Sequence, residues 1–241
     1  MTNDADHSNA VRLRDVRFAW RRDLPDVISI PELSIARGER VFLAGASGTG
    51  KSTLLALLGG VNVPREGVVQ VVGHQLARLK SSQRDAFRAD QVGFVFQMFN
   101  LVPYLSVIDN ITLPCEFSQR RRQLATERGC SLHDEAVRLL DALELTSGDI
   151  QRRSAMELSI GQQQRVAAAR ALIGAPSLII ADEPTSALDE GTRERFLELL
   201  FNECSAIGTT LLFVSHDGRL GPLFDRQIAM DEINKPDHRP L

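Results

Sequence analysis

The spacing of hydrophobic and polar residues changes several times along the chain. Between residues 11 and 43, apolar and polar residues alternate in short runs that break at Pro25, Pro31 and Gly38. Alternation with a period of two is typical of strands with one buried face, so this region predicts β-hairpins. Residues 41–44 (VFLA) are continuously apolar and predict a short buried strand that leads into a glycine-rich turn.

Further elements follow from the same reasoning. Residues 52–58 are apolar and rich in helix formers, which predicts a buried helix. Short β-rich runs predict strands at 67–73, 92–96, 178–181 and 209–215. Because helical stretches precede the last two strands, the pattern predicts a parallel sheet with right-handed crossovers.

Strand signals fade between about residues 100 and 157. Ala136, Leu139, Leu140 and Leu143 recur there at helical spacing, which predicts a helical insertion. Within it, residues 116–131 are expected to be a loose, charged segment, and the arginines at 120–122 to form a solvated face.

Composition narrows the class of protein. The 241 residues are 43% hydrophobic and 24% charged with a net charge of −3, which excludes a disordered chain and permits a real core. This near-neutral balance gives no reason to expect nucleic acid as a partner. The three separated cysteines predict thiols in a reducing compartment, and residues 1–10 lack the pattern of a signal peptide. We therefore expect a cytosolic globular protein.

Residues 45–52 (GASGTGKS) carry the clearest chemistry. They match G-x-x-x-x-G-K-[ST] between a predicted strand and a predicted helix. Glycines let backbone N–H groups wrap phosphates, and the start of the helix places a positive dipole end on the same anion. Lys51 would neutralise the β and γ phosphates and the Ser52 hydroxyl would bind Mg²⁺. The sequence therefore predicts nucleotide binding.

Several polar positions follow predicted strands or begin a helix. Residues 178–182 (LIIAD) are an apolar strand ending in a carboxylate suited to Mg²⁺, and Glu183 follows it and could activate water. Residues 158–165 (LSIGQQQR) begin a helix with a small hydroxyl residue and a glycine. Gln97 ends one strand and His216 another.

Together these segments resemble the ATP-binding cassette (ABC) transporter ATPases. Residues 45–53 resemble the Walker A motif, Gln97 the Q-loop, LSIGQQQR the signature motif and LIIADE the Walker B motif. SALD at 186–189 resembles the D-loop and His216 the switch histidine, and the order agrees from about residue 11 to 230. Trp20, the single tryptophan, lies where the family carries an aromatic residue that stacks on adenine, with core packing as the alternative.

The resemblance implies ATP and Mg²⁺ as cofactors and assigns site residues by motif. Catalytic roles fall to Glu183, His216, Lys51 and Gln97, and metal binding to Ser52, Gln97 and Asp182. The residues expected to bind nucleotide are Trp20, Gly45, Ala46, Ser47, Gly48, Thr49, Gly50, Lys51, Ser52, Thr53, Gln97, Ser159, Gly161 and Gln162.

In the family two ATPase subunits enclose two ATPs head to tail. The resemblance implies that Ser159 and Gly161 close over the γ-phosphate bound by residues 45–52 of a second copy. One position departs from the family: Ile160 stands where the LSGGQ signature has its first glycine. Its β-branched side chain is expected to impair closure or turnover.

The implied fold is α/β: a P-loop NTPase with a RecA-like parallel-sheet core, an N-terminal antiparallel β subdomain and an inserted α-helical subdomain. The whole chain is read as one nucleotide-binding domain, with residues 11–97 and 160–230 as core and β subdomain and about 98–159 as helical subdomain.

The segments from 54 to 73 and from 87 to 114 resemble the lipoprotein-release, macrolide-export and cell-division branch. That branch implies a few-span membrane partner with a large extracytoplasmic domain and a place on the inner face of the plasma membrane. A transmembrane signalling switch and an importer ATPase for a small polar solute stay open as alternatives. DNA-repair and translation cassettes are disfavoured because the chain has one cassette and the stretch between Lys51 and Ser159 is too short for a long coiled coil.

Overall fold

A computed structural model describes residues 8–145 and 149–236. Within it the chain forms two compact units, one made of the described residues up to 88 and from 210 onward, the other of residues 89–209. α2 (Ser81–Gln91) crosses the point at which the chain passes from the first unit to the second. Among the described residues no helix is both long and apolar enough to cross a bilayer.

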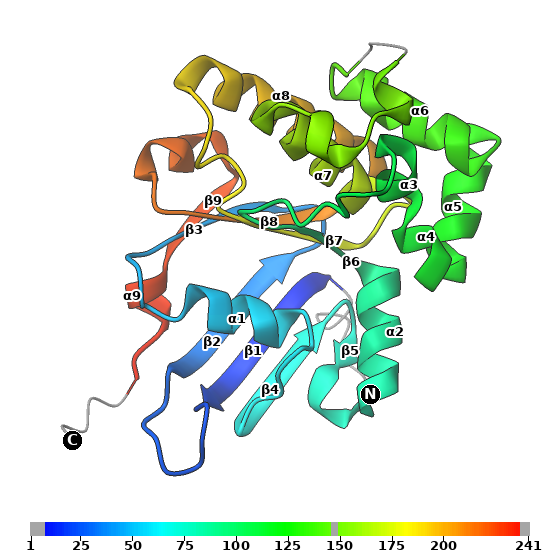
Figure 1. The fold of residues 1–241 in the computed structure, drawn as a ribbon. Helices are drawn as coiled ribbons and strands as arrows, with labels where there is room; N and C mark the ends of the chain where they lie inside the picture. Colours follow the sequence, from blue (N-terminus) through cyan, green and yellow to red (C-terminus); the bar gives the residue numbers. More distant parts are fainter. Residues whose placement is uncertain (1–7, 146–148, 237–241) are drawn as a thin grey trace. The chain divides into compact units, whose positions relative to one another are not determined.

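The first unit contains an antiparallel sheet with strand order β2-β1-β4-β5 (Figure 1). Val11 and Leu13 of β1 are buried, and beyond a register shift in its pairing with β4 so are Val16 and Phe18, so each half of the strand has the predicted period of two. The pairing of β1 with β2 confirms the predicted hairpin. The bounds are β1 (Asn9–Phe18), β2 (Ile28–Ala36), β4 (Glu66–Val71) and β5 (His74–Gln75).

The same unit holds three parallel strands. β3 (Arg40–Ala44) pairs with β8 (Thr210–Ser215) on one side and β9 (Arg226–Ala229) on the other. Phe42, Phe213 and Phe224 pack together there, with ring centroids 5.2 to 6.3 Å apart. Short helices complete the unit: α1 (Lys51–Leu58), η2 (Leu76–Arg78), η5 (Gly218–Leu223) and α9 (Met230–Ile233).

The second unit joins two parallel strands, β6 (Val92–Val95) and β7 (Leu178–Asp182), to a group of helices (Figure 1). α7 packs against several of these elements: four of its buried residues are alanines (Ala167, Ala168, Ala169 and Ala171), and such small side chains let neighbouring backbones approach. The helices are α3 (Val107–Thr112), α4 (Pro114–Phe117), α5 (Gln119–Gly129), α6 (Leu132–Ala142), η3 (Ile150–Arg152), η4 (Ala155–Glu157), α7 (Ile160–Leu172) and α8 (Glu190–Ile207).

One expectation about the helical insertion is wrong. The segment expected to be loose forms α4 and α5, because Pro114 occupies the first turn of α4 and the Ser118 hydroxyl accepts a hydrogen bond from the Arg121 N–H at the start of α5. Arg121 is not on a solvated face. It is 2% exposed, and its guanidinium donates to the carbonyls of Ile173 and Ala171 at the end of α7.

The fold class is the predicted one. β1, β2, β4 and β5 contribute only to the antiparallel sheet, β3 belongs to the parallel strands, and a helical region is inserted between β6 and β7. The predicted strands at 178–181 and 209–215 are β7 and β8, and the predicted helix at 52–58 is α1.

Candidate nucleotide site

The phosphate loop begins where three parallel strands end together. In the register of the first unit, Ala44 of β3 lies opposite Ser215 of β8 and Ala229 of β9. Gly45 and His216 therefore leave the sheet at the same edge, the carboxyl ends of adjacent parallel strands. Ligands of open α/β sheets bind at this kind of edge. The pairing brings together the predicted loop and the predicted histidine.

Two loop glycines occupy positions that other residues would not fit. A Cβ on Gly45 would lie 2.9 Å from both the Met230 Cβ and the Thr49 Oγ1. Gly50 has φ +99°, and a Cβ there would also lie 3.0 Å from Ile28. Since side chains are excluded at both positions, the backbone is left to form a close-fitting cradle, as phosphate binding requires.

Lys51 and Ser52 open α1. The Lys51 ammonium donates to the carbonyls of Gly45 (2.6 Å) and Ala46 (2.9 Å), so its charge lies within the loop. The N-cap of α1 is Gly50, which has no side chain to cap the helix. The first N–H groups and the dipole of the helix are thus available to an anion beside an ammonium group. This chemistry fits the polyphosphate of a nucleotide, and the exposed Ser52 hydroxyl is an oxygen ligand of the kind Mg²⁺ prefers.

A cavity of about 520 Å³ borders the loop. Ser47, Gly48 and Thr49 line one part of it, and the other lining residues are Pro25, Asp26, Val27, Met230, Asp231, Asn234 and Pro236. Asn234, which the sequence reasoning missed, joins these walls: its amide donates to the carbonyls of Val27 and Thr49 at 3.0 Å each. No motif marks Asn234, because its partners lie about 200 positions away in the sequence.

Trp20 follows the end of β1. Its side chain is 59% exposed, and its ring meets Phe18 edge to face with centroids 5.2 Å apart. Trp20 is therefore not a core residue, and a broad indole surface is available for stacking. Of the two alternatives for Trp20, this exposure argues against core packing.

In the second unit Asp182 ends β7 and Glu183 follows it. Glu183 has φ +49°, in the left-handed region that non-glycine residues rarely adopt. The next residue is Pro184, which restricts its predecessor to extended conformations. Backbone strain of this kind is concentrated at functional sites, where the surrounding structure maintains it.

The signature segment begins α7 with a capping box. The Ser159 hydroxyl accepts from the Gln162 N–H at 3.4 Å, and the Gln162 side chain accepts from the Ser159 N–H at 3.0 Å. Ile160, the first residue of the helix, is 55% exposed. A β-branched residue in place of glycine has therefore not disturbed the cap, because its side chain points away from the packed face.

Gln97 follows β6, and its loop is held by a residue that no motif suggested. The Arg170 guanidinium of α7 donates to the carbonyls of Phe99 (2.5 Å) and Asn100 (2.7 Å). Both of those residues have positive φ, 59° and 48°. Burial lowers the pKa of Arg170. An arginine in a helix rich in alanine was the one sequence signal for this contact.

The D-loop candidate also has a structural function. Asp189 is the N-cap of α8 and accepts from the Thr192 N–H at 3.0 Å. This backbone hydrogen bond, together with that from the Thr192 hydroxyl, lowers the pKa of Asp189.

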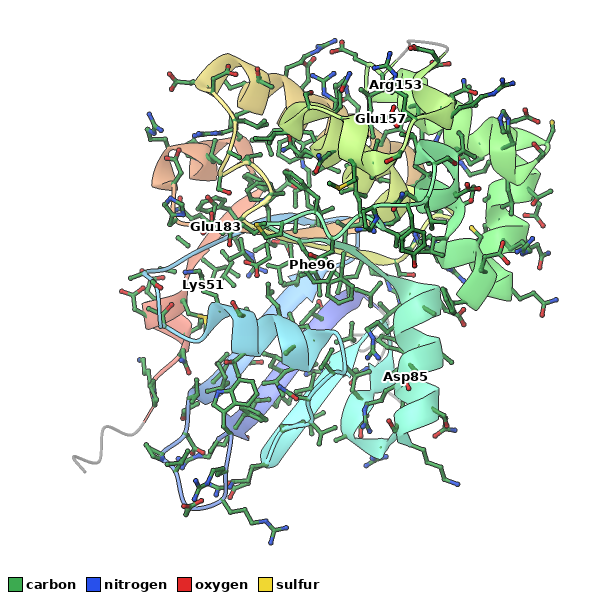
Figure 2. All side chains as sticks on the ribbon, viewed as in Figure 1. Lys51, Asp85, Phe96, Arg153, Glu157 and Glu183 are labelled. Atoms are coloured by element: carbon green, nitrogen blue, oxygen red, sulfur yellow. The ribbon has the colours of Figure 1, made fainter. Side chains whose placement is uncertain are left out.

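The predicted residues thus divide between the units. Trp20, the phosphate loop and His216 belong to the first, and Gln97, the signature segment, Asp182 and Glu183 to the second. Figure 2 shows Lys51 at the start of α1 and Glu183 just beyond β7. Among the described residues, no group of three or more His, Cys, Asp or Glu side chains is placed to hold a metal ion.

Comparisons with known proteins identify the family. Residues 29–186 match the family described as ABC transporter. The lipoprotein-releasing system ATP-binding protein LolD of Bordetella pertussis is 38% identical over 209 residues, which cover 86% of this chain and 85% of LolD. The uncharacterised ABC transporter ATP-binding protein YbbA of Escherichia coli K12 is 42% identical over 209 residues, 83% of each chain.

Solved structures extend the likeness to the fold. The cassette MJ0796, in a dimeric post-hydrolysis state bound to ADP and Pi, superposes with a TM-score of 0.78 and 35% identity over 91% of this chain and 93% of its own. A second dimeric structure of MJ0796 superposes with a TM-score of 0.74 and 34% identity, and it covers the same shares of the two chains. The family match over residues 29–186 spans the phosphate loop, the LSIGQQQR segment and the LIIADE segment. The chain therefore belongs to the ABC transporter family and is the ATP-hydrolysing subunit of a transporter.

Proposed function

We propose that this chain binds and hydrolyses ATP with Mg²⁺ and thereby drives a membrane partner of the lipoprotein-release or export type. The observation that carries the proposal is the phosphate loop. Its glycines exclude side chains, Lys51 lies within it, and α1 begins without a side-chain cap. These features favour a polyphosphate over any neutral ligand.

The roles of the residues follow from their chemistry and from the family motifs. Lys51 binds the β and γ phosphates, and Ser52, Gln97 and Asp182 bind Mg²⁺, which neutralises charge on the phosphates when bound. Glu183 activates the attacking water, and His216 stabilises the γ-phosphate in the transition state. The core with its β subdomain spans 11–97 and 160–230 and the helical subdomain about 98–159, so Gln97 lies where one becomes the other.

Nucleotide binding extends beyond Lys51 and Ser52. Trp20 stacks on adenine, and the N–H groups of residues 45–53 surround the phosphates. The nucleotide-binding residues of the loop are Gly45, Ala46, Ser47, Gly48, Thr49, Gly50, Lys51, Ser52 and Thr53.

Two copies enclose the nucleotides head to tail. Ser159, Gly161 and Gln162 of one copy close over the γ-phosphate held by the other, which suits the N-terminus of α7. MJ0796 was solved as a dimer with ADP and Pi, which supports the same arrangement for this chain.

The proposed partner is an integral membrane permease of few spans with a large extracytoplasmic domain, so the chain acts at the inner face of the plasma membrane. The similarity to LolD supports this branch. An exposed apolar surface after Gln97 provides a place for the partner. Met98 and Tyr104 are more than four-fifths exposed, and the Ser154 hydroxyl donates to the carbonyl of Pro103, the residue before Tyr104.

The experiment is purification of tagged Glu183→Gln protein from its native membranes with MgATP present, followed by identification of what accompanies it. The variant should bind ATP, form dimers and hydrolyse poorly. A few-span protein with a large extracytoplasmic domain is the expected companion. A many-span permease would contradict the branch, and recovery of soluble partners alone would contradict the transport function.

A matched pair of variants tests the proposed surface. Tyr104→Asp should reduce recovery of the membrane partner at least tenfold while ATP binding is unchanged. Leu223→Asp changes an apolar residue of the first unit that is 45% exposed, and it should leave recovery unchanged. Equal recovery with both variants would show that the partner binds elsewhere.

A further inference from the structure

Gln164, the third glutamine of the signature segment, has an unusual environment. Its side chain is fully buried within the second unit. Its Nε2 donates to the carbonyl of Pro184 at 2.9 Å, and its Oε1 has no hydrogen-bond partner in the described part of the chain. The amide is oriented by that one carbonyl, because the opposite orientation would place oxygen against oxygen.

Stability does not explain this amide. A buried polar atom without a partner costs about 1–3 kcal/mol, and an apolar side chain would exchange the unpaired Oε1 for an unpaired Pro184 carbonyl, so the amide brings little net stability. The buried residues one turn further along the same face of α7 are Ala167 and Ala168, so an apolar residue at 164 would suit the packing. A buried, half-satisfied group of this kind calls for a function elsewhere.

The carbonyl that Gln164 holds lies next to the strained residue of the site. Pro184 follows Glu183, whose φ is +49°. The proline ring fixes φ at residue 184, so fixing the Pro184 carbonyl restricts the rotation left between that carbonyl and the Glu183 backbone. The turn continues with a hydrogen bond from the Ser186 N–H to the Glu183 carbonyl at 3.3 Å.

We propose that Gln164 is a positioning residue for Glu183: it holds the Pro184–Thr185 peptide, one peptide beyond the proposed catalytic base, and so keeps the Glu183 carboxylate in its hydrolytic orientation. The inference rests on the proposed catalytic role of Glu183. With this role, α7 has two functions. Its first residues face the nucleotide of a second copy, and Gln164, one turn later, holds the turn after β7 in its own chain.

The test compares steady-state hydrolysis in the full chain, isolated with its membrane partner. Gln164→Met keeps an unbranched side chain of similar length and removes the N–H donor. We expect kcat to fall about tenfold with KM within twofold, because ground-state ATP binding does not involve Glu183. The melting temperature should change little, because losing the donor to the Pro184 carbonyl is offset by removing the unpaired Gln164 Oε1. Gln164→Leu should show the same changes in kcat and KM, and it replaces Gln164→Met in the test if the methionine variant folds poorly.

The matched control is Thr209→Val. The buried Thr209 hydroxyl also donates to a prolyl carbonyl in the second unit, that of Pro176, away from the motifs. The Thr209→Val variant should be less stable than wild type and should keep the wild-type kcat. A wild-type kcat in both Gln164 variants, or a rise in KM alone, would overturn the positioning role. Glu183→Gln measured in parallel separates the two proposals: if it turns over at the wild-type rate, the catalytic assignment itself fails.

Discussion

Two helices of this protein begin at proposed phosphate sites, and they begin differently. α1 starts after Gly50 with no side-chain cap, and an ammonium group lies in the loop before it. α7 starts with a complete capping box in which Ser159 and Gln162 bond to each other's backbone. The N–H groups of α1 are left for a ligand, whereas α7 satisfies part of its own N-terminus.

This difference suits two modes of binding. A loop shaped by glycines and carrying a lysine is organised for a phosphate before the ligand arrives. A capped helix stays intact whether or not an anion is near, so it can separate from a nucleotide in each cycle without fraying. The loop is therefore suited to hold its ligand, and α7 to make and release contact.

The C-terminal ends of the two helices are more alike. Arg88 and Arg84 of α2 donate to the carbonyls of Gly59 and Gly60 just after α1. Arg121 of α5 likewise donates to the carbonyls of Ala171 and Ile173 at the end of α7, but its side chain is almost fully buried. Both helices are thus anchored by guanidinium groups on their last carbonyls, where the helix dipole favours positive charge.

The largest effect should come from removing the charge at the start of α1. We expect Lys51→Ala to weaken ATP binding about 100- to 1,000-fold, because charge-assisted hydrogen bonds to two phosphates are lost. Equilibrium titration of the Trp20 fluorescence with MgATP measures this. Lys80→Ala removes an exposed lysine of the same unit and should bind normally. Affinity within threefold of wild type for Lys51→Ala would contradict the account of the loop.

Breaking the anchor of α7 should have the next largest effect. Arg121→Met leaves the buried carbonyls of Ala171 and Ile173 without donors, at about 2 kcal/mol of unfolding free energy. For a chain of this length that corresponds to a fall in melting temperature of about 4–8 °C. Arg122→Met, at the neighbouring exposed pair with Glu116, should change it by less than about 1 °C. Equal melting temperatures for the two variants would mean that Arg121 is not the anchor.

Arg121 also shows which contacts cannot be predicted from the sequence. Local patterns identified β1, β7, β8, α1 and the phosphate loop, because alternation, apolar runs and glycine spacing act over a few residues. Arg121 was expected in solvent, since nothing near it in the sequence shows that the end of α7, some fifty positions later, needs donors. Arg170, Gln164 and Asn234 were missed for the same reason: each is defined by a distant backbone carbonyl.

A smaller effect should separate capping from catalysis at α7. Ser159→Ala removes the side-chain half of the capping box and should cost about 1 kcal/mol of stability. It should also lower kcat/KM severalfold, if the hydroxyl contacts the second nucleotide. Ser131→Ala is the matched control, because Ser131 caps α6 in the same unit by the same bond to a third-residue N–H. It should lose similar stability and keep hydrolysis. Parallel losses of activity in both variants would reduce Ser159 to an ordinary cap.

The smallest effect is expected at the departure from the family. Ile160 is half exposed at the first turn of α7 and the capping box forms around it, so Ile160→Gly should cost at most about 1 kcal/mol of stability. Hydrolysis should be equal or up to about threefold faster, because removing the branched side chain lets the opposing phosphate approach the helix N-terminus. Steady-state kcat with a melting curve measures both. Ile160→Ala keeps helix propensity while removing the branch, so it should match the glycine variant in rate and exceed it in stability. A tenfold loss of kcat in both would instead show that the isoleucine side chain itself contacts the partner copy.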